Sequence, residues 1–319
     1  MAGCCLWLHS AFLVFMYSFS TCWNSGRHTD GRAMLREIRD LGFAYAELSH
    51  GIRISLLPGI FEAVDAGDIQ ISTLHNFCPL PMGINQAAPN IYKFTSPDPR
   101  ERDSALRHTL KTIETAVRVK AELVVLHLGC VEIKDYTDKL IAMAAEGKKD
   151  TPKFEKICAE VIEKREEKKE KALELANSVL RQLVVEAERK GIKLGIENRE
   201  ALEEVPFESD FSFFFRDFQS PAVAYWHDTG HAQIKENLGF IHHGLHLESM
   251  ADRLAGFHIH DVEFPARDHR PPGRGMVDFA ALKPWVRRDH IKVLELSPSL
   301  SVDEVRAGVA HIHGIWGEE

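Results

Sequence analysis

Short runs of apolar, often β-branched residues alternate along this chain with longer segments of helical pattern. The short runs are apolar almost throughout, which is typical of strands buried on both faces in a parallel sheet covered by helices. The candidate strands are Phe12–Phe19, Tyr45–Ser49, Ile69–Asn76, Leu123–Gly129, Lys193–Arg199, Val223–Asp228, Gly256–Asp261 and Lys292–Ser297. The helical segments lie near Gly31–Leu41, Pro58–Ala66, Arg100–Lys120, Lys153–Lys190, Phe211–Phe218, Leu247–Leu254, Asp278–Arg288 and Val302–Ile312.

This alternation predicts the fold class. Eight strand–helix units are the number that closes a parallel sheet into a (β/α)8 barrel, and 319 residues are enough to form one. The alternative is a doubly wound open sheet, which is disfavoured because no Gly-x-Gly-x-x-Gly turn follows the first strand. We therefore predict an α/β protein with a single TIM-barrel domain over residues 16–319.

Two segments exceed what a minimal barrel needs. The crossover after the fourth strand includes Ala142–Lys190, and its middle part, Glu163–Lys171, has no apolar face. Acidic and basic residues four positions apart support one another on a solvated helix, so we predict a long, charged helical insertion here. Pro79–Pro99 is rich in proline, asparagine and alanine. It predicts a long loop on the side where barrel loops cover substrate pockets.

The N-terminal segment Met1–Trp23 is apolar enough to be compared with a signal peptide or a membrane anchor. No lysine or arginine precedes its apolar part, polar residues interrupt it, and no small-x-small cleavage site closes it. We therefore favour a buried first strand. With Met16 as the natural start, residues 1–15 would be an N-terminal extension.

Charge and cysteine content narrow the function classes. The formal net charge is −8, so the chain lacks the overall positive charge of proteins that bind nucleic acid mainly through its phosphates. Its six cysteines show no CxxC or zinc-finger spacing, which favours reduced thiols in a cytoplasmic protein. We expect no nucleic-acid or membrane partner, and the sequence leaves the oligomeric state open.

Polar residues, most of them able to bind a metal, gather at the ends of the predicted strands. Active sites of TIM barrels lie at the C-terminal ends of the strands, so these residues should meet at one mouth. They are His75, Asn76, His127, Glu197, Asn198, Arg199, Asp228, His231, His258, His260, Asp261 and Glu295. Buried carboxylates need a cation or a partner, and carboxylate and imidazole ligands together suit Mn²⁺, Zn²⁺, Mg²⁺ or Co²⁺. We therefore predict a divalent metal ion as cofactor.

Several of these residues belong to motifs that occur in a fixed order. The motifs are Gly195-Ile196-Glu197-Asn198, His227-Asp228-Thr229-Gly230-His231-Ala232, Phe257-His258-Ile259-His260-Asp261, Pro272-Gly273-Arg274-Gly275 with Asp278-Phe279, and Leu294-Glu295-Leu296. This pattern resembles the xylose isomerase-like TIM-barrel superfamily over essentially the whole chain from about Met16. The superfamily includes sugar isomerases and epimerases, the inosose dehydratase group, and abasic-site nucleases of the endonuclease IV type.

The resemblance implies a set of metal ligands. The metal quartet of the family falls on Glu197, Asp228, His260 and Glu295. In the nuclease branch two histidines hold another metal together with the bridging glutamate, and the matching residues here are His75 and His127. A role as hydrogen-bonding residues of the pocket is the alternative for both histidines.

The resemblance also implies residues that contact the substrate. His231 resembles the residue that touches a substrate oxygen in epimerases and binds a third zinc in the nuclease branch. His269 matches a second ligand of that zinc, but Arg267 stands where the nuclease pattern requires an aspartate. A cation there opposes a third zinc, although Asp268 is adjacent. Candidates for binding substrate hydroxyls or a phosphate, with solvent-facing side chains as the alternative, are Arg199, Arg267 and Arg270.

The leading hypothesis is a metal-dependent isomerase or epimerase that acts on a sugar, keto-sugar or polyol. Removing a proton next to a carbonyl creates an enediolate that a divalent cation stabilises. Two carboxylates, Glu197 and Glu295, can move the proton between opposite faces of the carbon. A hydride shift is a variant of this function. The alternatives are a metal-dependent abasic-site endonuclease and a barrel that binds metal or sugar without catalysis.

Overall fold

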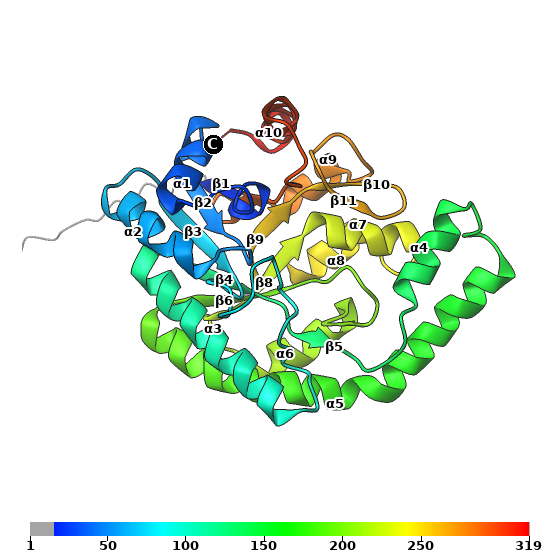
Figure 1. The fold of residues 1–319 in the computed structure, drawn as a ribbon. Helices are drawn as coiled ribbons and strands as arrows, with labels where there is room; N and C mark the ends of the chain where they lie inside the picture. The colour runs from blue at the N-terminus through cyan, green and yellow to red at the C-terminus, as the bar shows by residue number, and fades with distance from the viewer. Residues whose placement is uncertain (1–15, 319) are drawn as a thin grey trace, which may run out of the picture.

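The computed structural model describes residues 16–318 and shows a closed barrel of eight parallel strands surrounded by helices (Figure 1). The barrel strands are β1 (Met16–Ser20), β2 (Tyr45–Leu48), β3 (Gln70–His75), β4 (Leu123–Leu126), β6 (Lys193–Glu197), β8 (Val223–Asp228), β9 (Leu254–Ile259) and β12 (Ile291–Leu294). β12 pairs with β1 and closes the barrel, with Met16 opposite Ile291 and Phe19 opposite Leu294. The predicted single-domain TIM barrel is confirmed.

All eight predicted strands are present, with ends that differ by a few residues. The first strand was expected at Phe12–Phe19. Its first four residues, like the whole of the expected extension 1–15, lie outside the described residues. β9 begins at Leu254 rather than Gly256, because Leu254, which was expected to end the preceding helix, belongs to the strand.

Helices follow the strands around the outside of the barrel. They are α1 (Gly31–Asp40), α2 (Leu57–Asp65), α3 (Pro99–Val119), α4 (Thr137–Ala145), α5 (Pro152–Lys190), α6 (Phe211–Asp217), α7 (Thr229–Leu238), α8 (His243–Met250), α9 (Phe279–Leu282) and α10 (Val302–Trp316). Sequence patterns missed α4 and α7. The helix expected at Leu247–Leu254 is α8, which ends earlier because Leu254 belongs to β9. The one expected at Asp278–Arg288 is reduced to α9 and a 3-10 turn.

Smaller elements decorate this framework. The 3-10 helices are η1 (Thr21–Trp23), η2 (Ile54–Leu56), η3 (Glu208–Asp210) and η4 (Lys283–Trp285). Two antiparallel ribbons pair β5 (Gly129–Cys130) with β7 (Glu204–Val205), and β10 (Asp261–Glu263) with β11 (Arg267–Arg270). Both ribbons follow the C-terminal ends of barrel strands, so they lie on the side where a TIM barrel carries its active site.

Side chains fill the barrel interior. A buried cluster inside it consists of Leu123, Val125, Trp226, Ile291 and Val293. The alternate residues of β4, Val124 and Leu126, belong instead to the larger core between strands and helices. Gly256 makes room for the indole, because a Cβ at this position would lie 2.5 Å from Cζ3 of Trp226.

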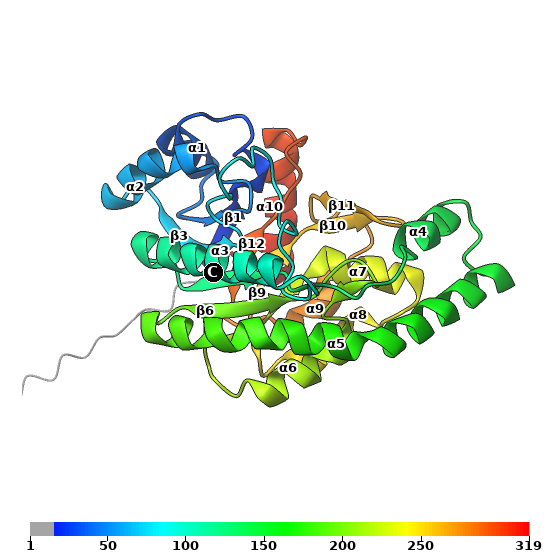
Figure 2. The ribbon, with the colours of Figure 1, turned by 60° about the horizontal axis from the view of Figure 1, so that its bottom comes forward.

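The charged helical insertion after β4 is confirmed as α5, and α4 precedes it. α5 is 39 residues long, passes along one side of the barrel and extends with α4 beyond it (Figure 2). Its middle part was expected to be solvated, but Arg165 is buried there. Nη1 of Arg165 donates to the carbonyl oxygen of Leu202 at 2.9 Å, and the guanidinium pairs with Asp210. This contact fastens the insertion to the segment before α6.

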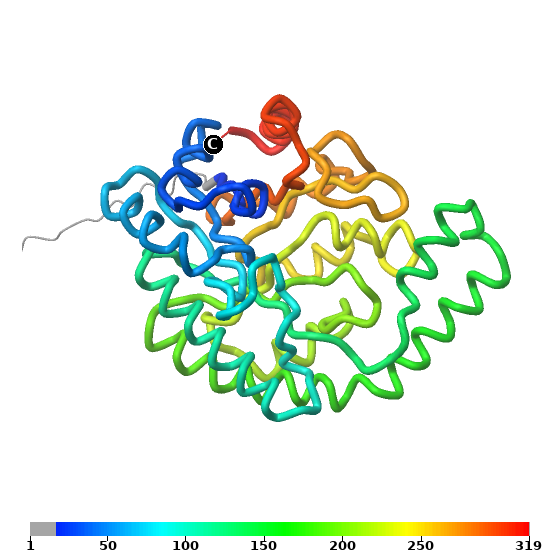
Figure 3. The backbone as a smooth tube through the Cα atoms, in the orientation of Figure 1, coloured from blue at the N-terminus to red at the C-terminus, as the bar shows by residue number. Residues whose placement is uncertain are grey.

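The long loop predicted after the third strand connects β3 to α3 without a helix or strand of its own. In Figure 3 this segment, residues 76–98, runs in cyan across the open end of the barrel.

The described cysteines, which are Cys22, Cys78, Cys130 and Cys158, are free thiols. Within residues 16–318 no helix combines the length and apolar character needed to cross a membrane.

Buried hydrogen bonds link the end of β8 to helix α8. Oη of Tyr225 lies 2.7 Å from Nδ1 of His227 and 2.9 Å from Nε2 of His246. Nε2 of His227 lies 2.9 Å from Nε2 of His243. Burial lowers the pKa of both His243 and His246 to about 3. The network therefore consists of neutral imidazoles at pH 7.

We expect this network to make the fold sensitive to acid. The unfolded chain binds protons at His243 and His246 once the pH falls below their ordinary pKa of 6.5, whereas the folded chain binds them only near pH 3. The free energy of unfolding should therefore decrease as the pH falls from about 6.5 towards 3. Urea unfolding of metal-free protein at about pH 7.5 and pH 5 measures the loss.

The variant His246→Gln keeps a hydrogen-bonding amide beside Tyr225 but cannot titrate. It should lose less stability between the two pH values than the wild type does. His311→Gln, a matched change at an exposed position, should behave like the wild type. Equal losses in His246→Gln and the wild type would contradict the role of His246.

Candidate metal centre

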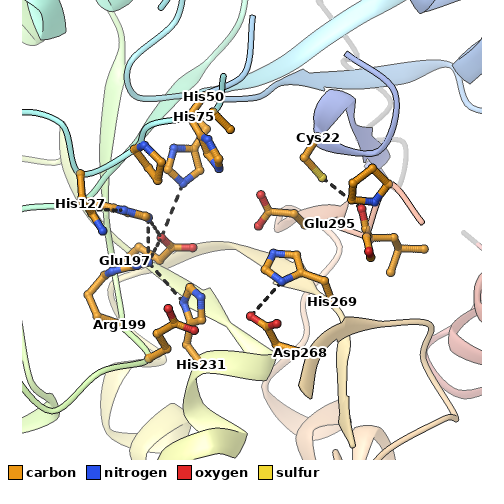
Figure 4. A pocket seen from close by; sticks show the side chains of 17 residues that line it. Cys22, His50, His75, His127, Glu197, Arg199, His231, Asp268, His269 and Glu295 are labelled. Atoms are coloured by element: carbon orange, nitrogen blue, oxygen red, sulfur yellow. Dashed lines mark hydrogen bonds and ion pairs between the residues drawn. The ribbon is translucent and has the colours of Figure 1, made fainter. Parts of the chain in front are cut away.

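The C-terminal ends of the barrel strands and the loop 76–98 enclose a pocket of about 430 Å³ (Figure 4). The lining consists of Cys22, His50, His75, Ala87, Pro89, Asn90, His127, Glu197, Arg199, Glu200, His231, Asp268, His269, Glu295, Leu296, Ser297 and Pro298. Of the site residues expected from the sequence, the pocket is lined by His75, His127, Glu197, Arg199, His231, His269 and Glu295.

Four buried side chains converge at this mouth, and we call them the central group. Glu197 ends β6, Asp228 ends β8, His258 lies on β9 and Glu295 follows β12. Each of the four offers a ligand atom within 4.8 Å of the others. Nδ1 of His258 lies among the carboxylates, 2.7 Å from Oε1 of Glu197 and 3.1 Å from Oε2 of Glu295. Its distance to Oδ2 of Asp228 is 3.8 Å.

A further carboxylate, Glu47 at the end of β2, orients His258. Oε2 of Glu47 lies 3.0 Å from Nε2 of the imidazole and accepts from Oγ1 of Thr73 at 2.9 Å, while Oε1 accepts from Oγ of Ser20 at 2.9 Å. Burial lowers the pKa of His258, but the carboxylates around it, led by Glu295, raise it well above the usual range. The protonated ring therefore neutralises carboxylates on both of its sides.

The structure places His260 differently from the expected metal quartet. Its Nδ1 accepts the backbone N–H of His269 at 2.9 Å, so its Nε2 carries the hydrogen and donates to Asp228 at 3.0 Å. Giving up that hydrogen to bind a metal would leave His260 as an anionic imidazolate, whereas the protonated His258 can lose its Nδ1 hydrogen and become a neutral ligand. His260 thus lies beside the central group rather than in it, and it forms a cluster with His231 and with Asp228, which both groups share.

Backbone contacts hold Asp228 in place. Its N–H donates to Oδ1 of Asn198 at 2.7 Å, and Nδ2 of Asn198 donates to its carbonyl oxygen at 3.0 Å. Oδ1 of Asp228 accepts the N–H of His231 at 2.7 Å and so caps the start of α7. Asp261 faces elsewhere and accepts N–H groups of the Gly-x-Gly turn at Gly273 and Gly275.

His75 and His127 both approach Glu197, as the resemblance implied. Nε2 of His127 lies 2.6 Å from Oε2 of Glu197, and Nε2 of His75 lies 3.8 Å from the same oxygen. Arg199 shares this place, with its Nη1 2.8 Å from Oε2 of Glu197. Burial raises the pKa of Glu197, but its neighbours, led by His258, lower it well below the usual range.

A second cluster forms at the rim of the pocket. Glu200, His231 and Asp268 each offer a ligand atom within 4.8 Å of the other two. His269 lies next to them, with Nδ1 2.9 Å from Oδ2 of Asp268. Its ring stacks on His260 at a centroid distance of 4.3 Å. Asp268, rather than Arg267, is therefore the side chain of this loop that faces the pocket.

Two arginines expected to bind substrate lie away from the pocket. Arg267 and Arg270 are on β11, where both pair with Glu263 of β10, at 3.0 Å and 2.9 Å. Neither lines the pocket. The structure does not bring them to the site, because the antiparallel ribbon turns both side chains towards its own acidic residue.

Sequence reasoning missed Glu47, His50, Asn90 and Glu204. Glu47 lies near the C-terminal end of a predicted strand, so the rule that found the other carboxylates could have found it as well. His50 follows three residues later and lines the pocket with a buried Nδ1 that has no hydrogen-bond partner in the described part of the chain. Asn90 and Glu204 lie on a loop and a ribbon, where no sequence signal marked them.

The barrel with its central group is similar to solved structures of several proteins. Solved structures of similar fold include a D-tagatose 3-epimerase-like protein, at 17% identity and a TM-score of 0.67 over 95% of this chain and 98% of that one. The 3-keto-D-glucoside 4-epimerase YcjR from E. coli has 15% identity and a TM-score of 0.66, over 94% and 99%. An IolI protein with a binding zinc atom has 15% identity and a TM-score of 0.64, over 94% and 99%.

A search of curated protein sequences finds no significant match. A sequence model of one family, described as xylose isomerase-like TIM barrel, matches residues 35–307. This range includes the whole central group and all barrel strands except β1. The chain therefore belongs to the xylose isomerase-like TIM-barrel family.

Proposed function

We propose that this protein is a divalent-metal-dependent isomerase or epimerase of a sugar, keto-sugar or polyol. The observation that carries the proposal is the central group, in which three carboxylates and one oriented histidine converge beside a pocket of small-molecule size. Solved structures of this fold include a D-tagatose 3-epimerase-like protein and a 3-keto-D-glucoside 4-epimerase, which supports a sugar as the substrate.

The donor atoms of the central group fit a divalent ion. Three buried carboxylates within 4.8 Å repel one another unless a positive group lies among them. His258 is oriented as metal-ligating histidines usually are, with one nitrogen bonded to a carboxylate, Glu47, and the other facing the site. We propose as ligands Glu197, Asp228, His258 and Glu295, with His258 in place of His260. Such donors suit Mn²⁺, Zn²⁺, Mg²⁺ or Co²⁺.

When bound, the ion supplies a Lewis acid that favours negative charge on the substrate oxygens. Glu295 is the better candidate for carrying the proton, because its one ion pair in the described part of the chain is with His258. Glu197 is engaged through both oxygens, with His258 and Arg199. The two carboxylates face each other across the pocket (Figure 4), and we propose that Glu197 serves the opposite face of the carbon.

His231 and His269 are our candidates for binding substrate oxygens. Nδ1 of His231 donates to the carbonyl oxygen of Asn198 at 3.0 Å, which leaves Nε2 for a ligand. Burial lowers the pKa of His269, but Asp268 raises it to about 9, so the ring is charged at neutral pH. A charged imidazole whose Nδ1 is held by a carboxylate presents Nε2–H as a donor.

Endonuclease IV-type cleavage of abasic DNA is the second candidate. His75 and His127 beside Glu197 are the observation that favours it. One placement favours the isomerase, because a guanidinium, that of Arg199, contacts both His127 and Glu197. Arg267, which replaces the aspartate of the nuclease pattern, decides less, because the neighbouring Asp268 lies at the rim beside His231.

His258 and His260 give a matched pair of variants that tests the ligand set. His258→Ala should lose tightly bound metal because it removes a ligand, whereas His260→Ala should retain it because it removes only a partner of Asp228. Elemental analysis after dialysis against the same dilute metal measures both. Glu47→Gln should weaken metal affinity by about 10–100-fold, as loss of a histidine's outer partner does. If His258→Ala retained the metal and His260→Ala lost it, the ligand set expected from sequence, with His260, would be correct.

Metal removal should lower the melting temperature. An ion that binds only the folded chain adds about 2.7 kcal/mol at a free concentration about 100 times its Kd. Thermal unfolding with and without chelator measures this difference, and His258→Ala, the control, should melt at the same temperature in both. An unchanged melting temperature of wild-type protein after verified metal removal would count against a preformed site.

Glu295→Gln tests the proposed reaction. It should reduce turnover by about 10²–10⁴-fold, the scale of general acid–base catalysis, while sugar binding persists. Incorporation of solvent deuterium at the substrate carbon should disappear with it, and product analysis identifies a hydride shift, which exchanges no proton. Glu174→Gln, exposed on α5, is the matched control. Cleavage of abasic duplex DNA by wild-type protein, lost in Glu295→Gln, would replace the isomerase by the nuclease.

A further inference from the structure

Arg199 occupies the position that the resemblance assigns to a second metal ion, between His75, His127 and Glu197. Its Nη1 lies 2.8 Å from Oε2 of Glu197 and 2.7 Å from Nε2 of His127. Those two acceptor atoms are themselves 2.6 Å apart. A metal ion bridging these residues would need the same two atoms as ligands, so the ion and Nη1 compete for one place.

Hydrogen bonds around His127 identify Nη1 as the donor to both acceptors. Oδ1 of Asn90 lies 2.9 Å from Nδ1 of the ring, and the amide nitrogen of Asn90 faces Oε1 of Glu204 at 3.4 Å. Nδ1 of His127 therefore carries the hydrogen, and its Nε2 presents a lone pair. Two acceptors 2.6 Å apart repel unless a positive group bonds both. The guanidinium of Arg199 is that group.

Glu204 holds Arg199 in this orientation. Nε and Nη2 of Arg199 each lie 3.1 Å from Oε1 of Glu204, and Oε2 of Glu204 accepts the N–H of Ala201 at 3.1 Å. Glu204 is on β7, which pairs with β5 directly after β4. Two nitrogens of the planar guanidinium are thus anchored while the third reaches Glu197, a geometry that lysine cannot reproduce. Arg199 is 3% exposed and always charged.

From this geometry we propose that Arg199 is a built-in second cation of the centre, which restricts metal binding to the central group and excludes an ion from His75 and His127. The position of the first ion rests on the proposed function. Glu197 would then help to hold an exchangeable ion in the central group, while Arg199 is a permanent cation at its Oε2. A hydrolytic enzyme with clustered metals would offer a substrate oxygen a second Lewis acid at this place, which the guanidinium fills here.

The decisive experiment counts the ions that depend on His127 in two backgrounds. Metal content is measured by elemental analysis after equilibration with the same concentration of Zn²⁺ for the wild type, His127→Ala, Arg199→Ala and the double variant. In the wild-type background, removal of His127 should change nothing. In the Arg199→Ala background it should remove about one ion, because the freed lone pairs of His75, His127 and Glu197 form a three-ligand site. Arg267→Ala, which removes an exposed arginine, should match the wild type.

Loss of an ion on His127→Ala in the wild-type background would overturn the proposal, and so would the absence of a His127-dependent ion once Arg199 is removed. Because the measured quantity is a difference, ions at the rim cluster cancel. If the central ion is missing from every protein, the proposed function fails, while the difference still decides the role of Arg199.

A second measurement needs no variant. Electron paramagnetic resonance of the wild type titrated with Mn²⁺ should show isolated ions even at excess metal. A spin-coupled pair bridged by Glu197 would show that a second ion enters beside Arg199, and it would overturn the proposal.

Discussion

Buried negative charge at the barrel mouth is the constraint on which the rest of this structure depends. The carboxylates of Glu47, Glu197, Asp228 and Glu295 are almost completely removed from water. Each would destabilise the fold by several kcal/mol if it remained ionised without partners. His258 lies among all four, and this one imidazole gives the carboxylates a shared positive group. Arg199 adds a second positive charge beside Glu197, and neutral N–H and O–H groups donate to Asp228 and Glu47.

These partners come from different strands, so the compensation exists only when the barrel is closed. Glu47 lies on β2, Glu197 on β6 and His258 on β9, and hydrogen bonds connect them across the mouth. Elements outside the barrel position the other side chains around Glu197. The β5–β7 ribbon positions Glu204 against Arg199, and the loop 76–98 positions Asn90 against His127. The long insertion is in turn fastened by the buried Arg165.

The fold could be predicted because its signal is repeated along the whole chain, whereas the site depends on contacts that repetition does not encode. Carboxylates such as Glu197 and Asp228 were found because they end apolar strands. His258 and His260 are two residues apart and therefore on the same face, so only their depth in the barrel separates them. Arg199 and Arg267 carry the same charge. Glu204 holds Arg199 in the site, and Glu263 holds Arg267 outside it. Both carboxylates lie on short antiparallel ribbons that the sequence patterns did not predict.

The packed interior of the barrel has a consequence for the order of events at the mouth. Trp226 fills the space that Gly256 leaves open, and its ring lies 5.1 Å from that of His258, so the floor of the site is solid. Neither the ion nor the sugar can therefore reach the site through the barrel interior, and both enter from the side of the pocket. On the proposed function, the ion has to be loaded before the sugar, and a bound sugar stands in its way out. Exchange of the ion with the solvent would therefore be slowest during turnover, when losing it would be most damaging.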